Sequence, residues 1–181
     1  MTGARGKVRE LPSRDECLAI LHEHACNDEV VKHCVAVSIL AVKIAKKCRA
    51  KVELVEVGAL LHDLGRCKTH GMAHAVEGAK IASKLDLPES IVKIIERHIG
   101  AGITAEEAQA IGLPKKDYVP ETLEEKIVAH ADNLMSGDRR TSIKEAVSHL
   151  ARREQHDAAM KVLRLHEELS EICGANIDDI W

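Results

Sequence analysis

Apolar residues recur at helical spacing along most of the chain. The clearest case is residues 27–49, where apolar side chains return every three or four positions, at Val30, Cys34, Val37, Ala41, Ile44 and Cys48. Asn27 precedes them as a good capping residue, and Asp28 and Glu29 follow it where a helix carries partial positive charge. The pattern predicts a long helix over 27–49.

Similar spacing predicts helices in most of the remaining chain. They cover residues 13–25, 52–64, 72–85, 88–99, 104–112, 121–137, 141–150 and 154–173. The alternation typical of strands is hardly visible, and we find no repeat or linker. The sequence therefore predicts an all-α, single-domain helical bundle over 13–181, preceded by a flexible leader over 1–12. Within the domain, residues 28–137 would form the core, and 141–173 the C-terminal helices.

The segment 52–64 is apolar almost all round, which is typical of a central helix. It ends in "LLHDLGR", where His62 and Asp63 are adjacent and Gly65 stops the helix. Two titratable side chains are costly in apolar surroundings unless something satisfies them. Either they bond to each other and to nearby backbone, or they hold a metal ion.

Composition narrows the classes of partner. Aromatic residues make up only 1% of the 181 residues, so the core must be built from Leu, Ile, Val and Ala, and aromatic platforms for bases are scarce. The net charge of −3 gives no sign of a nucleic-acid or membrane partner. Without a long apolar run or a secretion signal, the chain is expected to be cytoplasmic. The six cysteines form no C-x-x-C pair, which favours buried free thiols over a disulfide framework.

Six polar residues lie near an apolar face or a helix end on five predicted helices. They are His33, His62, Asp63, His74, His98 and Asp132. Taken singly, each has a plain structural explanation as a core histidine, a helix cap or a solvated side chain. Taken together, imidazoles and carboxylates are the ligands of Mn, Fe, Co, Ni or Zn, whereas Mg prefers oxygen alone. Four His and two Asp would suffice for two metals bridged by one carboxylate.

The order and spacing of these residues resemble the HD-domain (HDIG-type) metal-dependent phosphohydrolase superfamily, in particular its small stand-alone archaeal and bacterial members. The matching motifs are His33, "LLHDLGR", "HAVEGA" from His74, "ERH" ending in His98, and "AHADNL" with Asp132. The match runs from about residue 28 to about residue 137.

The resemblance implies an all-α fold with divalent transition metals at its centre. His33, His62, Asp63 and Asp132 would bind a first ion, and His74 and His98 a second one bridged by Asp63. The implied reaction is hydrolysis of a phosphodiester or phosphomonoester of a small nucleotide by a metal-activated hydroxide, with Asp63 as a catalytic residue that orients it. Arg66 replaces the lysine of the family motif and would bind phosphate as a second catalytic group.

Three further cations are candidate substrate ligands. His70 lies in the loop before His74, where it either contacts substrate or is a free loop residue. Arg139 and Arg140 follow Asp132 by two helical turns and either reach a nucleotide or form a solvated pair.

Three functional hypotheses follow. The first is a phosphohydrolase acting on a small phosphorylated substrate, expected to be a nucleotide. The second is a metal-dependent RNA nuclease, favoured by four arginines (139, 140, 152 and 153) but opposed by the net charge and the few aromatics. The third is a non-catalytic module that senses a metal or a nucleotide.

Overall fold

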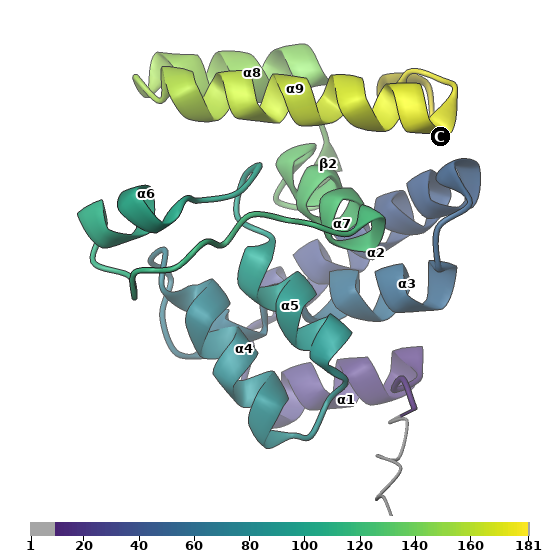
Figure 1. Cartoon of the computed structure of the whole chain (residues 1–181). Helices are drawn as coiled ribbons and strands as arrows, with labels where there is room; N and C mark the ends of the chain where they lie inside the picture. Colours follow the sequence, from purple (N-terminus) through teal and green to yellow (C-terminus); the bar gives the residue numbers. More distant parts are fainter. Residues whose placement is uncertain (1–9, 181) are drawn as a thin grey trace, which may run out of the picture.

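The computed structural model describes residues 10–180, so most of the predicted leader lies outside the described residues. The described residues form nine α-helices, two short 3-10 helices and one two-stranded hairpin (Figure 1), which confirms the predicted all-α class. The α-helices are α1 Arg14–Glu23, α2 Asp28–Cys48, α3 Val52–Leu61, α4 His74–Lys84, α5 Glu89–Arg97, α6 Ala105–Ala110, α7 Leu123–Asn133, α8 Ile143–Arg152 and α9 His156–Cys173. None of these helices is both long and apolar enough to cross a membrane.

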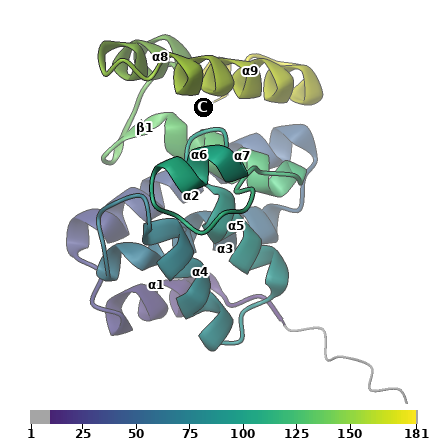
Figure 2. The same ribbon diagram turned by 60° about the vertical axis from the view of Figure 1, so that its left-hand side comes forward.

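The helices form layers. Helices α8 and α9 lie side by side across one end of the molecule, and α9 packs on α7 and on α2 (Figures 1 and 2). Below α7, the long helix α2 packs on α3, and α3 contacts α1, α5 and α7. Helix α3 is therefore central, as its apolar sequence predicts, and its end can reach residues from several helices.

The core is aliphatic. The largest fully buried side chains are Leu21, Ile44, Leu60, Leu61, Leu64, Ile91, Ile94, Ile95, Ile127, Leu134, Leu169 and Ile177. Local signals set the helix starts: the side chains of Ser13 and Asn27 accept hydrogen bonds from the backbone amides of Glu16 and Val30. The same capping occurs at Thr122 before α7.

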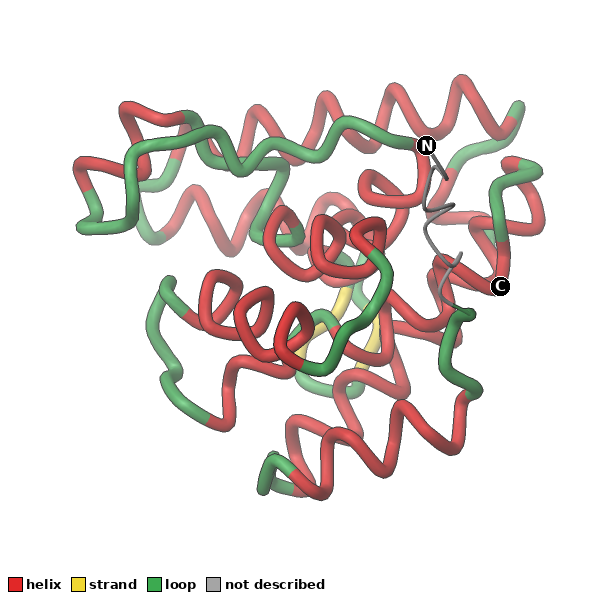
Figure 3. Tube along the Cα trace, turned by 60° about the horizontal axis from the view of Figure 1, so that its bottom comes forward, coloured by secondary structure: helices red, strands yellow, loops and turns green. Residues whose placement is uncertain are grey.

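Two predicted helix ends are wrong. Helix α3 ends at Leu61, and the chain continues as a 3-10 helix, η1 Leu64–Cys67. Helix α7 ends at Asn133 instead of Gly137, and strands β1 Met135–Ser136 and β2 Arg139–Arg140 form a hairpin (yellow in Figure 3). Strands of two residues are too short to show an alternating pattern, so sequence periodicity could not reveal them.

The expectation of free thiols is wrong for two of the six cysteines. A disulfide joins Cys48, at the end of α2, to Cys173, at the end of α9. These residues are 125 positions apart, and only the docking of α9 against α2 brings them together. Cys17, Cys26 and Cys34 are buried free thiols, and Cys67 is a partly exposed one.

Thiol titration checks this assignment. Burial raises the pKa of the Cys17 and Cys26 thiols to about 12, and the thiolate is the reactive form. At pH 8 we expect a disulfide-exchange reagent to modify Cys67 rapidly in the native protein, and all four free thiols after unfolding without reductant. Six reactive thiols in the unfolded, unreduced chain would disprove the Cys48–Cys173 bond.

Candidate metal centre

The structure brings the six predicted ligands to one place. His33 lies on α2, His62 and Asp63 directly follow α3, His74 begins α4, His98 directly follows α5, and Asp132 lies in the last turn of α7. His62, Asp63, His74 and His98 are buried, whereas His33 and Asp132 keep 17% and 24% of their side-chain surface exposed. The centre is therefore deep, and solvent reaches it on the side of His33 and Asp132.

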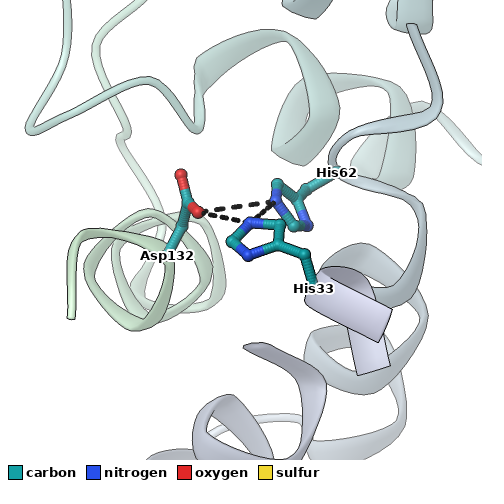
Figure 4. A group of neighbouring side chains, drawn as sticks. All are labelled: His33, His62 and Asp132. Atoms are coloured by element: carbon teal, nitrogen blue, oxygen red, sulfur yellow. Dashed lines mark hydrogen bonds and ion pairs between the residues drawn. The ribbon is translucent and has the colours of Figure 1, made fainter. Parts of the chain in front are cut away.

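The first group of ligand atoms comprises His33, His62 and Asp132 (Figure 4). The Nε2 atom of His33 lies 2.9 Å from Asp132 Oδ1 and 3.3 Å from His62 Nε2. His62 Nε2 is 3.6 Å from the same Asp132 oxygen. Three ligand atoms from α2, the end of α3 and α7 thus face one small space.

Asp63 joins this group to a second one. Its Oδ2 atom lies 3.7 Å from His62 Nε2 and 3.8 Å from His33 Nε2. Its Oδ1 atom lies 3.1 Å from His74 Nε2 and 3.6 Å from His98 Nε2, and these two nitrogens are 3.0 Å apart. One carboxylate therefore presents one oxygen to each pair of histidines.

Backbone carbonyls fix the orientation of all four imidazoles. The Nδ1 atoms of His33, His62, His74 and His98 contact the carbonyls of Gly137, Ala59, Gly71 and Ile95 at 2.7, 2.7, 2.8 and 2.7 Å. A carbonyl only accepts, so each Nδ1 must donate and, in the neutral ring, Nε2 carries the lone pair. Such bonds are the usual support of metal-binding histidines, and here they aim four Nε2 atoms at the centre.

Local sequence explains how three of these rings are held. His62, His74 and His98 each contact the carbonyl three residues earlier, which is possible because each lies at a helix start or end. Close backbone packing then joins two of the segments. A Cβ atom on Gly65 would lie 1.9 Å from the His74 carbonyl oxygen and 2.5 Å from the Gly78 nitrogen. Only glycine therefore lets the turn after Asp63 approach α4 closely enough for His74 to reach Asp63.

The charges of the centre fit a cation. Burial alone would raise the pKa of Asp63, but the charge of His62 and the close approach of the His74 and His98 ring nitrogens hold it well below its usual range. The pKa of Asp132 is likewise lowered, because hydrogen bonds from His33 and His62 outweigh its burial. Both carboxylates are therefore ionised, and the fully buried Oδ1 of Asp63 makes no hydrogen bond.

The facing nitrogens of two histidines also indicate a cation at the centre. Two neutral imidazole nitrogens 3.0 Å apart, as in His74 and His98, bring their lone pairs together unless a proton or a cation lies between them. Burial opposes protonation of His62, yet Asp63 raises its pKa well above the usual value. A metal ion would replace such a proton, so the donor set fits divalent transition metals.

Arg66 lies against the centre. Its Nε atom donates to Asp63 Oδ2 at 2.6 Å, and its Nη1 atom donates to the His70 carbonyl at 3.4 Å. About a third of the Arg66 side chain is exposed, at 31%. His70 itself is an exposed loop residue. Arg66 and His70 are the two predicted substrate ligands near Asp63. Arg66 contacts the centre directly, whereas the backbone carbonyl of His70 accepts a hydrogen bond from Arg66.

The two hairpin arginines have different surroundings. Arg139 is 65% exposed and lies 3.7 Å from Glu145 Oε1. The guanidinium of Arg140 instead donates to the carbonyls of Ile177, Asp178 and Ile180, which tie the hairpin to the C-terminal 3-10 helix, η2 Ile177–Asp179. We therefore keep Arg139 as a candidate substrate ligand and assign Arg140 a structural role.

Sequence reasoning missed two residues that support the centre. Gly137, predicted as a helix stop, provides the carbonyl that holds His33, while Asn133 Nδ2 donates to the Gly100 carbonyl at 2.8 Å. Asn133 follows Asp132 directly, and Gly100 lies two residues after His98. The neighbouring His130 does not belong to the centre, because it is buried against His166 on α9, with 3.0 Å between the ring nitrogens.

Comparison with known proteins gives the same family as the motifs. The sequence profile of the HD domain matches residues 30–137. The chain is 46% identical over 165 residues to an uncharacterised protein of Methanocaldococcus jannaschii. That match covers 87% of this chain and 97% of the relative. It is also 50% identical over 173 residues to a Picrophilus torridus protein named tRNA (cytidine(56)-2'-O)-methyltransferase. That match covers 96% of this chain but 51% of the relative, so the chain spans about half of that protein's length.

A solved structure has the same fold. The HD domain of the L. monocytogenes phosphodiesterase PgpH, in complex with cyclic-di-AMP, superimposes with a TM-score of 0.59 at 19% identity, over 90% of this chain and 94% of that one. This likeness supports the fold, and the profile match covers the segment that carries the motifs, residues 30–137. The chain belongs to the HD domain family.

Proposed function

We propose that this protein is a metal-dependent phosphohydrolase that cleaves a phosphodiester bond in a nucleotide substrate. The observation that carries the proposal is the position of Asp63, whose two oxygens face two separate pairs of histidines. A carboxylate between two sets of imidazoles is the arrangement needed for a bridging ligand of two cations. The solved PgpH domain, a phosphodiesterase of the same fold, is consistent with this proposal.

Six residues would hold two ions. His33, His62, Asp132 and Asp63 Oδ2 would bind one, and His74, His98 and Asp63 Oδ1 the other. Ions bound there would activate water and neutralise charge on the phosphoryl group. Mn, Fe, Co, Ni and Zn all suit imidazole with carboxylate.

The chain's own groups would orient the reactants. Arg66 lies beside Asp63 and is partly exposed, so its guanidinium can turn from the carboxylate to a phosphate and bind two of its oxygens. Asp63 remains ionised and would accept a hydrogen bond from the attacking water. The exposed edge formed by His33 and Asp132 is the side from which substrate would approach.

The name of the Picrophilus relative makes RNA the first nucleotide polymer to test, because that protein is named for a reaction on tRNA. Methyl transfer does not require four imidazoles and two carboxylates at one point, so we base the proposal on hydrolysis. This chain would then be a hydrolase that acts on RNA.

Hydrolysis of chromogenic esters tests the proposal. We expect protein freed of metal by a chelator to be inactive, and Mn²⁺, Co²⁺ or Ni²⁺ to restore hydrolysis of bis(p-nitrophenyl) phosphate by on the order of a thousandfold. Parallel assays with p-nitrophenyl phosphate separate diesterase from monoesterase activity. Metal binding without hydrolysis of either ester would contradict the proposal and favour a sensing module.

A further inference from the structure

A second feature lies beside the metal centre. A cleft of about 650 Å³ runs between α8, the hairpin and the end of α7. Its volume falls within the roughly 300–1,000 Å³ typical of ligand sites. Its lining includes Asn133 on α7, Arg139 on the hairpin, and Lys144, His149 and Arg152 on α8.

The cleft carries positive charge although the whole chain is acidic. Arg139, Lys144 and Arg152 line it, and Glu145 is the acid among the lining residues. Glu145 is engaged in the start of α8, where one of its oxygens accepts hydrogen bonds from the amide and hydroxyl of Ser142. Its other oxygen lies 3.7 Å from Arg139, so Lys144 and Arg152 provide the excess positive charge, which favours an anionic ligand.

Two segments that form the wall of the cleft also support the metal centre. Asn133 lines the cleft, follows Asp132 directly and donates to the Gly100 carbonyl, two residues after His98. The hairpin that carries Arg139 also provides the Gly137 carbonyl that holds His33. The cleft and the metal centre are therefore built in part from the same segment, the end of α7 and the hairpin that follows it.

We propose that the cleft binds the backbone phosphates of a single-stranded oligonucleotide, next to the phosphate held at the metal centre. The inference rests on the proposed function and names its substrate class. Lys144 and Arg152 are eight residues apart on α8, or about 12 Å along the helix axis, which one phosphate cannot span. The buried position of His62 and Asp63 favours a single strand, because a duplex could not bring its backbone to them.

Contacts to the backbone predict binding that is independent of base sequence and weakened by salt. The test measures the affinity of metal-free protein for fluorescent oligoadenylates of two, four and eight nucleotides by anisotropy. The octamer is expected to bind at least tenfold more tightly than the dinucleotide. Each lost phosphate contact should lower the slope of log affinity against log salt by about 0.7.

Paired variants locate the contacts. We expect the Lys144→Ala/Arg152→Ala double variant to bind the octamer about tenfold more weakly or worse, with a smaller salt slope. Arg153→Ala is the matched control, because Arg153 is exposed at the end of the same helix but does not line the cleft. An equal loss in this control, equal affinity for all three lengths, or equally strong binding of ATP would overturn the inference.

Two further measurements separate this inference from the proposed function. If bis(p-nitrophenyl) phosphate is hydrolysed but the double variant binds the octamer like wild type, the cleft assignment fails and the phosphohydrolase stands. If binding depends on oligonucleotide length and on the cleft residues but no ester is hydrolysed, the phosphohydrolase proposal fails and the cleft assignment stands. A deoxyadenylate octamer is compared with the RNA octamer. Equal affinity would show that the cleft contacts only phosphates, and tighter binding of RNA would indicate added contacts to 2′-hydroxyl groups.

Discussion

Replacing Asp63 with alanine is expected to remove both metal ions and to lower kcat/KM for a phosphodiester at least about a thousandfold. Among the described residues, Asp63 is the one carboxylate whose oxygens face both pairs of histidines, with Oδ1 toward His74 and His98 and Oδ2 toward His33 and His62. Its loss removes a negatively charged ligand from both metal positions. Bound metal ions stabilise the transition state by several kcal/mol, and each loss of about 1.4 kcal/mol lowers the rate tenfold. Elemental analysis of metal per chain and steady-state kinetics measure the two effects.

The isosteric Asp63→Asn variant separates charge from shape. It keeps the volume of the side chain but replaces one oxygen with a donor, so at least one of the two positions loses a ligand. We expect intermediate metal content with activity close to that of Asp63→Ala. The exposed Asp157→Ala serves as a matched control, because Asp157 lies in the first turn of α9. Full metal content in Asp63→Ala would show that the assigned centre is wrong.

Replacing His98 with alanine is expected to remove one ion of two and to lower diesterase activity on the order of a hundredfold. His98 Nε2 contacts His74 Nε2 and Asp63 Oδ1, whereas the group of His33, His62 and Asp132 is formed by other residues. The remaining ion should stay bound, because three of its ligand side chains touch each other without His98. The measurement is the metal-to-protein ratio after dialysis, followed by the diesterase assay.

The exposed His156→Ala is the control for this change, since His156 begins α9 and is not among the ligand groups. It should retain both ions and full activity. The reciprocal variant His33→Ala should also lose one ion but retain the His74–His98 position. Unchanged stoichiometry in His98→Ala would count against two metal positions.

The sequence by itself determined the helices and the set of candidate ligands. Helix starts depend on bonds between near neighbours, such as Asn27 with Val30, so they can be read from a few letters. The supports of His62, His74 and His98 are equally local, since each ring contacts a carbonyl three residues earlier. Their position near an apolar face or a helix end made these six residues candidates, and the resemblance to a family then assigned each of them to a metal position.

Only the tertiary structure decided how these residues meet and what surrounds them. The His33–Asp132 contact joins positions 99 residues apart, and the Cys48–Cys173 bond joins positions 125 apart. Tertiary packing also decides three other features: the hairpin, the hydrogen bonds of Arg140 to the C-terminal turn, and the cleft along α8. The physical reason is that a helix follows from bonds within about four residues, whereas a shared site follows from how whole helices pack, which no local pattern encodes.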